Sequence, residues 1–271
     1  MAKLDTNAAW KEASAIVSAN REVLFALAGV FFMLPSLALS VIAGEPEIAA
    51  GMTREQMMAA MEEFYAGAWW IILVSAVLQI VGLMAILTLM RDRSRPTVGQ
   101  AIRAGLTSTP SYLAAQLLVV IGLSLLGGVL VGVAAAASSA LGVVMVLFVI
   151  GAIVFAVFRM LLVAPVVAVE GVRNPLRAMA RSWRLTQGNF WRLFAFVLLI
   201  LILFVVVVGL VRMIIGLILA LATSGEPQRN IAAVFSTALG AVGVVYFAGV
   251  IAAIHRQLGG PVAAESSGTF E

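Results

Sequence analysis

Cysteine is absent from the sequence, histidine occurs once, at His255, and only 11% of the 271 residues are charged. Without cysteine the chain cannot form disulfides or use thiol chemistry. Metal binding and proton transfer need converging His, Cys, Asp or Glu side chains, yet no carboxylate lies well inside any long apolar run. We therefore predict no metal site, no cofactor and no catalytic residues, and we expect His255, beside Arg256, to be solvated at an interface.

The scarcity of charge also excludes a water-soluble protein. Hydrophobic residues make up 63% of the chain and the mean hydropathy is +1.11, whereas soluble domains are roughly 45 to 50% apolar and about 25% charged. The apolar residues form continuous runs of roughly 20, the length of a transmembrane helix, rather than the alternating segments of about 10 that build barrels. The sequence predicts an all-α, polytopic integral membrane protein.

Six runs are long enough to span a bilayer. Because Arg21 precedes the first run and Val41-Ile42-Ala43 at its end resembles a cleavage site, that run could alternatively be a cleaved signal peptide. We expect one membrane domain over residues 1–258 and a disordered tail over 259–271. The predicted spans are 23–43, 67–90, 113–136, 141–169, 193–221 and 231–254.

Positive charge alternates between the connections of these spans. By the positive-inside rule, the arginine-rich connections and both termini face the cytoplasm, which predicts a multi-pass protein of the bacterial inner membrane. Only Arg54 and Arg229 lie on the opposite side. The cytoplasmic cations are Lys3, Lys11, Arg21, Arg91, Arg93, Arg95, Arg103, Arg173, Arg177, Arg181, Arg184, Arg192 and Arg256.

Three segments repeat one pattern: a Thr or Asn cap, a short amphipathic stretch, a polar break and then a span. They begin at Thr6, Thr97 and Asn174 and predict interfacial helices over 5–19, 97–107 and 175–187. This pattern predicts three units, each consisting of an interfacial helix followed by a helical hairpin. Coincidence of topology is the alternative, because any positive-inside hairpin protein places polar segments at alternate connections.

The third segment, 175–187, is the most strongly basic. Asn174 as cap, Pro175 at the first position and Gly188 after the last turn predict its ends. Its arginines share one sector of the helix and its apolar residues another, which is typical of a helix at the membrane surface. Recognition of an acidic protein is the alternative, and we expect no nucleic acid. The predicted headgroup-contacting residues are Arg173, Arg177, Arg181, Trp183, Arg184, Trp191 and Arg192.

Arg159 lies inside the fourth predicted span, where a charged side chain costs roughly 2.5 to 3.5 kcal/mol. It should therefore contact protein or water. Gln79 and Gln116, in the second and third spans, and Glu170 are its candidate partners. Arg159 is either a lipid or substrate contact inside the bundle, or a structural hydrogen-bonding or snorkelling residue.

Small residues mark close helix packing. Gly128 and Gly132 form a GxxxG motif in the third span. Such motifs let two backbones approach closely, either within the bundle or across a homodimer.

Residues 164–196 read APVVAVEGVRNPLRAMARSWRLTQGNFWRLFAF. Pro165 in a span, Glu170 at its end, an Arg-Ser-Trp segment and a Leu-Thr-x-Gly-Asn break resemble the membrane domain of some bacterial glycerophosphoryl diester phosphodiesterases and the related six-pass YciC-like proteins. The resemblance implies an all-helical membrane domain whose own activity is not established. In the phosphodiesterases catalysis belongs to a separate soluble barrel, which these 271 residues do not contain, so that activity is not carried over.

Two functions are compatible with these features. The first is a noncatalytic inner-membrane protein that binds anionic lipid headgroups or supports envelope organisation, with a homodimer or an envelope protein as possible partner. The second is a small transporter or channel with a polar site near Arg159, Gln79 and Gln116. Transporters usually have broken helices or intramembrane ions, and this chain offers few, so the first function is favoured.

Overall fold

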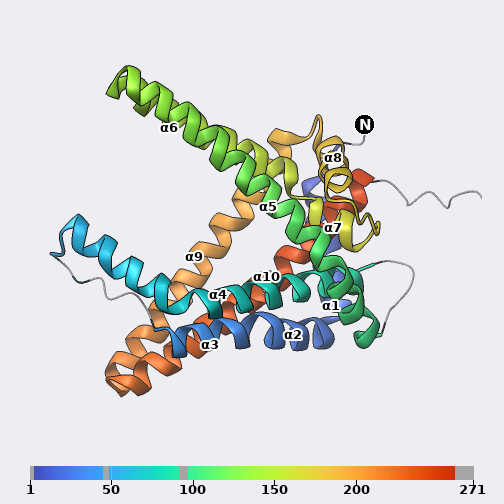
Figure 1. Ribbon diagram of the computed structural model, residues 1–271. Coiled ribbons are helices and arrows are strands. Elements are labelled where there is room, and N and C mark those ends of the chain that lie inside the picture. Colours follow the sequence, from blue (N-terminus) through green and yellow to red (C-terminus); the bar gives the residue numbers. More distant parts are fainter. Residues whose placement is uncertain (1–2, 45–48, 50, 92–96, 260–271) are drawn as a thin grey trace, which may run out of the picture.

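The computed structural model describes residues 3–44, 49, 51–91 and 97–259, which form helices joined by short turns and, within those ranges, no strand (Figure 1). Six helical spans among them are long and apolar enough to cross a membrane, which confirms the prediction of an all-α polytopic protein. They are Arg21–Ile42, Arg54–Leu89, Val98–Ala137, Ser139–Ala168, Phe190–Ala222 and Pro227–Gly259.

The chain begins with helix α1 (Thr6–Ala19), close to the range predicted for the first interfacial helix. Its cap is Asp5 rather than Thr6, because the Asp5 Oδ1 accepts the Ala8 N–H at 3.0 Å. Ala9 and Ala13 are fully buried, so α1 packs on protein along one side, against α10. The first span follows as α2 (Arg21–Ala28), the π-helical segment η1 (Gly29–Met33) and α3 (Leu34–Ile42).

Helices α4 (Arg54–Leu89) and α5 (Val98–Ala137) both start with a capping box, formed by Thr53 with Gln56 and by Thr97 with Gln100. The expected short helix over 97–107 is not separate, because α5 continues through Pro110 into the span. The polar stretch before that proline does not interrupt the helix, since Thr109 Oγ1 donates to the Gly105 carbonyl at 2.9 Å within the same helix. The second of the three predicted units therefore lacks its own interfacial helix.

The fourth span consists of two helices, α6 (Ser139–Met160) and α7 (Val163–Ala168), joined by a turn at 161–162. After α7 come α8 (Pro175–Thr186), α9 (Phe190–Ala222) and α10 (Glu226–Gly259). The predicted tail over 259–271 lies outside the described residues, apart from Gly259 at the end of α10.

One end of the bundle is formed by α1, α7, α8 and the last turns of α10, and we call it the α1/α8 end (Figure 1). The last turns of α3, α5 and α9 and the first turns of α4, α6 and α10 lie at the other end and spread apart. All six residues of α7 are buried, as are Val250–Ile254 on α10, whereas the most apolar windows of the third and fourth spans are only 6% buried. The most closely packed part of the protein is therefore its α1/α8 end.

The GxxxG motif does not pack within the described chain. A Cβ placed on Gly128 or Gly132 would meet no atom within 4 Å. Close helix contact occurs instead at Gly105, where a Cβ would lie 2.7 Å from the Val81 carbonyl oxygen of α4. The adjacent Gly127 is buried against Val149 of α6, whereas Gly128 and Gly132 are exposed, so the motif faces away from that neighbour.

Candidate functional site

Helix α8 carries most of the predicted headgroup-contacting residues, and its ends are set by local chemistry. The Asn174 Oδ1 accepts the Arg177 N–H at 3.0 Å, and Pro175, which has no N–H to satisfy, occupies the first helical position. The chain leaves the helix after Thr186 and turns at Gly188, whose φ of +79° favours glycine. Helix α8 therefore runs over Pro175–Thr186, one residue shorter than the predicted 175–187.

Two of the predicted headgroup residues have partners inside the protein. Arg181 Nε lies 3.1 Å from Glu170 Oε2. Arg173 donates from Nη1 to Ser108 Oγ at 2.7 Å and from Nη2 to Thr107 Oγ1 at 3.3 Å. The guanidinium groups of Arg181 and Arg173 therefore join α8 and the turn before it to neighbouring segments.

The remaining predicted cations, Arg177, Arg184 and Arg192, are exposed. Within the part of the chain that the structure describes, their guanidinium groups have no hydrogen-bond or ion-pair partner. The neighbouring indoles are exposed too, Trp183 to 40% and Trp191 to 76%. Exposed tryptophan beside exposed arginine at the end of a span is typical of the boundary between hydrocarbon and headgroups.

Glu170, in the turn after α7, is the centre of a half-buried polar cluster that the sequence did not predict. Besides Arg181 it contacts His255 of α10, with Oε1 2.9 Å from the histidine Nε2. His255 is only 5% exposed, so the expectation of a solvated residue is wrong. The reason is tertiary, because the last turns of α10 pack against α7 and α8, and that packing removes water from the imidazole.

The pKa of Glu170 reflects two opposing effects. Burial by itself raises this pKa, whereas the hydrogen bonds from His255 and Arg181 and their charges lower it. The partners outweigh burial, and the pKa of Glu170 lies below its ordinary value. At neutral pH the carboxylate is therefore ionised and holds the α7–α8 turn to α10.

Arg159 does not contact the glutamines expected as its partners. Its Nη1 lies 3.5 Å from the Trp183 carbonyl oxygen, and its guanidinium carbon lies 4.9 Å from the Trp183 ring centroid and 5.0 Å from that of Phe155. Gln116 instead has its partner within α5, where its side-chain N–H donates to the Tyr112 hydroxyl oxygen. Aromatic faces thus compensate the charge of Arg159 by cation–π attraction.

Close packing of α8 against α6 explains why α8 supplies these contacts to Arg159. Ser182 is fully buried and its Oγ donates to the Arg159 carbonyl at 2.7 Å. That bond holds α8 against the end of α6. The sequence shows Ser182 among arginines, but nothing in it indicates which group this serine contacts.

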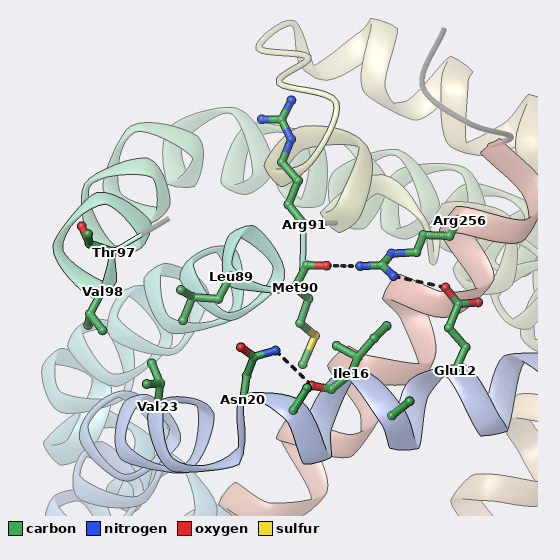
Figure 2. Close-up of a pocket in the computed structure, with 12 residues that line it drawn as sticks. Glu12, Ile16, Asn20, Val23, Leu89, Met90, Arg91, Thr97, Val98 and Arg256 are labelled. Carbon is green, nitrogen blue, oxygen red and sulfur yellow. Dashed lines mark hydrogen bonds and ion pairs between the residues drawn. The ribbon is translucent and has the colours of Figure 1, made fainter. Parts of the chain in front are cut away.

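A cavity of about 620 Å³ opens at the α1/α8 end between α1, α4, α5 and α10. Figure 2 shows Arg256 of α10 between two acceptors, with Nη1 3.3 Å from Glu12 Oε1 of α1 and Nη2 donating to the Met90 carbonyl at the end of α4. Asn20 and Arg91 also line it. The wall therefore carries both signs of charge, and Arg256, one of its two arginines, is already bound to protein.

In the ranges that the structure describes, no group of three or more His, Cys, Asp or Glu side chains is placed to hold a metal ion. Comparison with protein-family models, curated proteins and solved structures found no match. The resemblance of residues 164–196 to the phosphodiesterase membrane domain and the YciC-like proteins therefore stays a prediction.

Proposed function

We propose that this noncatalytic protein binds anionic phospholipids at its α1/α8 end, in the bacterial inner membrane and with both termini in the cytoplasm. The observation that carries the proposal is a group of exposed cations, Arg177, Arg184 and Arg192, which have no partner among the described residues and lie beside the exposed indoles of Trp183 and Trp191. A role in envelope organisation and a homodimer or envelope partner belong to the same proposal as consequences of lipid binding.

The size of the attraction follows from the number of available cations. Each basic residue near an anionic leaflet contributes about 1 kcal/mol. Of the five arginines predicted to contact headgroups, Arg173 and Arg181 are bound to Ser108 and Glu170. The other three contribute about 3 kcal/mol to attachment at the membrane surface. Their attraction is electrostatic, and it should weaken as salt concentration rises.

The packing of Arg159 supports this function over transport. A substrate-binding arginine needs a free guanidinium face in a polar cavity. In this chain the Arg159 guanidinium is half-buried and contacts the Phe155 and Trp183 rings and the Trp183 carbonyl.

The test is lipid retention by the protein purified in mild detergent, measured by native mass spectrometry. Replacing Arg177 and Arg184 together by glutamine should weaken binding of phosphatidylglycerol and cardiolipin about 30-fold, the equivalent of about 2 kcal/mol. The matched control replaces Arg54 and Arg229, exposed arginines at the opposite end, by glutamine and should retain the lipids. Unchanged retention in the Arg177 and Arg184 variant would overturn the proposal.

A further inference from the structure

A second cavity lies where the N-terminal segment meets the start of α9. It measures about 620 Å³, and its polar wall contains Lys3, Asp5 and Thr6 from one end of the chain and Arg192 from α9. Two cations therefore face one carboxylate. That carboxylate caps α1 by accepting the Ala8 N–H with its Oδ1, and the two cations leave the wall with a net positive charge.

Hydrogen bonds fix the N-terminal wall of this cavity. The Leu4 N–H donates to Asn189 Oδ1 at 3.0 Å, and the Asp5 N–H donates to Gln257 Oε1 at 3.1 Å. Leu4 and Asn189 are each only 3% exposed. The backbone beside Lys3 is thus tied to both α9 and α10, which holds the lysine near Arg192.

An apolar groove of about 520 Å³ continues from this cavity along α9 and α10. Leu199 lines the cavity and Leu203, one helical turn further, lines the groove; Thr6 and Trp10 of α1 are related in the same way. Residues one turn apart lie on the same face of a helix. The two spaces therefore adjoin, with a charged part at the α1/α8 end and an apolar part toward the middle of the bundle.

The combined length matches one lipid leaflet. From Arg192 to Val207, the most distant α9 residue of the groove, the helix rises about 22 Å at about 1.5 Å per residue. Half of a bilayer of about 40 to 45 Å, headgroups included, is about 21 Å. A phosphate at Arg192 thus places an acyl chain of ordinary length along the groove.

We infer that these two spaces form one binding site for a single anionic glycerophospholipid, with its phosphate between Lys3 and Arg192 and one acyl chain in the groove between α9 and α10. The inference rests on the proposed function and specifies a discrete site for it. Hydrocarbon in the groove contacts Trp10, Phe204 and Gly240, while the cation pair selects a net negative headgroup. Arg177 and Arg184 are not part of this site.

Gly240 allows the groove to be closed without disturbing the backbone. It lines the groove, and a Cβ added there would meet no atom within 4 Å, so a leucine side chain would enter the space meant for the acyl chain. Gly216 on α9 is the matched control, because a Cβ there also meets nothing within 4 Å and the residue lines neither space. Gly240→Leu and Gly216→Leu thus add the same side chain inside and outside the site.

The experiment titrates the purified full-length protein in mild detergent with phosphatidylglycerol or phosphatidylcholine of the same acyl composition. Native mass spectrometry measures the dissociation constant of the first lipid bound. Arg192→Gln should weaken phosphatidylglycerol about fivefold and the Lys3→Gln, Arg192→Gln pair about 30-fold, without affecting phosphatidylcholine. Gly240→Leu should weaken both lipids at least about tenfold, the effect of displacing two methylenes, and Gly216→Leu should bind like the wild type.

The outcomes separate this site from the general proposal. If the wild type retains no anionic lipid, the proposed function itself fails. If it retains lipid but Gly240→Leu and Arg192→Gln bind the first lipid like the wild type, the site is overturned and the exposed arginines of α8 remain. A wild-type dimer that Gly240→Leu converts to monomer would show that a second copy covers the groove, and would also overturn the site.

Discussion

Glu170 and His255 lie 85 positions apart in the chain, yet Glu170 Oε1 and His255 Nε2 are 2.9 Å apart. The same carboxylate binds Arg181, so one acidic group joins the turn after α7, the middle of α8 and the last turns of α10. The basic helix α8 is held against the bundle by this contact. Its arginines at 177 and 184 are then presented on the outside.

Glu170→Gln should destabilise the protein. The amide keeps the shape of the side chain but does not neutralise Arg181, and a hydrogen bond to a charged group contributes roughly 1.5 to 3 kcal/mol. We expect the free energy of unfolding in detergent to fall by about 2 kcal/mol. The control is Glu63→Gln on α4, an exposed residue with no ion pair among the described residues, and an equal loss in both variants would contradict the role of Glu170.

The same carboxylate should make stability depend on pH in the acid range. Although burial raises the pKa of Glu170, His255 and Arg181 lower it below the ordinary value. A lowered pKa in the folded state gives stability that is complete above the unfolded pKa, about 4, and is lost as pH falls through the folded value. The unfolding temperature of the wild type should therefore fall more between about pH 5 and about pH 3 than that of Glu170→Gln. Parallel curves for the two proteins would exclude this contribution.

Gly105→Ala should weaken the contact between α4 and α5. The new Cβ would lie 2.7 Å from the Val81 carbonyl oxygen and 3.1 Å from the Ala85 nitrogen, so the two backbones must separate, at a cost of about 1 to 3 kcal/mol. Gly128→Ala, on the same helix, meets open space and should stabilise α5 by about 0.5 to 1 kcal/mol. Thermal unfolding of both variants in detergent measures the difference. A larger loss at Gly128 than at Gly105 would contradict the packing described here.

The absence of cysteine makes each introduced thiol unique, so the orientation can be tested directly. We expect Arg184→Cys to react with a membrane-impermeant maleimide only after bacterial cells are opened, because the α1/α8 end is predicted to face the cytoplasm. Glu63→Cys, at the opposite end, should react in cells whose outer membrane alone is permeabilised. Both native side chains are exposed, so accessibility rather than burial decides the result. The reverse labelling pattern would place the basic helix outside and remove the basis for the proposed function.

Features that depend on neighbouring residues could be predicted from the sequence. Asn174, Pro175 and Gly188 define α8 to within a residue, because capping and left-handed turns are local. The interruption expected near residue 108 was wrong, since the threonine hydroxyls there bond within the helix and α5 continues. Helix propensity alone does not show whether a polar stretch ends a helix or continues it with its hydroxyl groups hydrogen-bonded inside the helix.

The partners of the charged residues could not be predicted. Arg173 reaches Ser108 across 65 positions, and Arg159 contacts Trp183 rather than Gln79 or Gln116. The sequence shows which groups carry charge, but several candidate partners lie at similar distances along the chain. Only helix packing selects among them.

By itself the sequence determined that this protein is surrounded by hydrocarbon and made of six spanning helices with a basic helix at one end. Those properties follow from long apolar runs and local caps, which act over one helix at a time. The tertiary structure decided which arginines remain available, because neutralisation of Arg181 and burial of His255 require Glu170 to meet two helices that are separate in the chain. Such a meeting depends on the packing of α7, α8 and α10 together, which no single segment encodes.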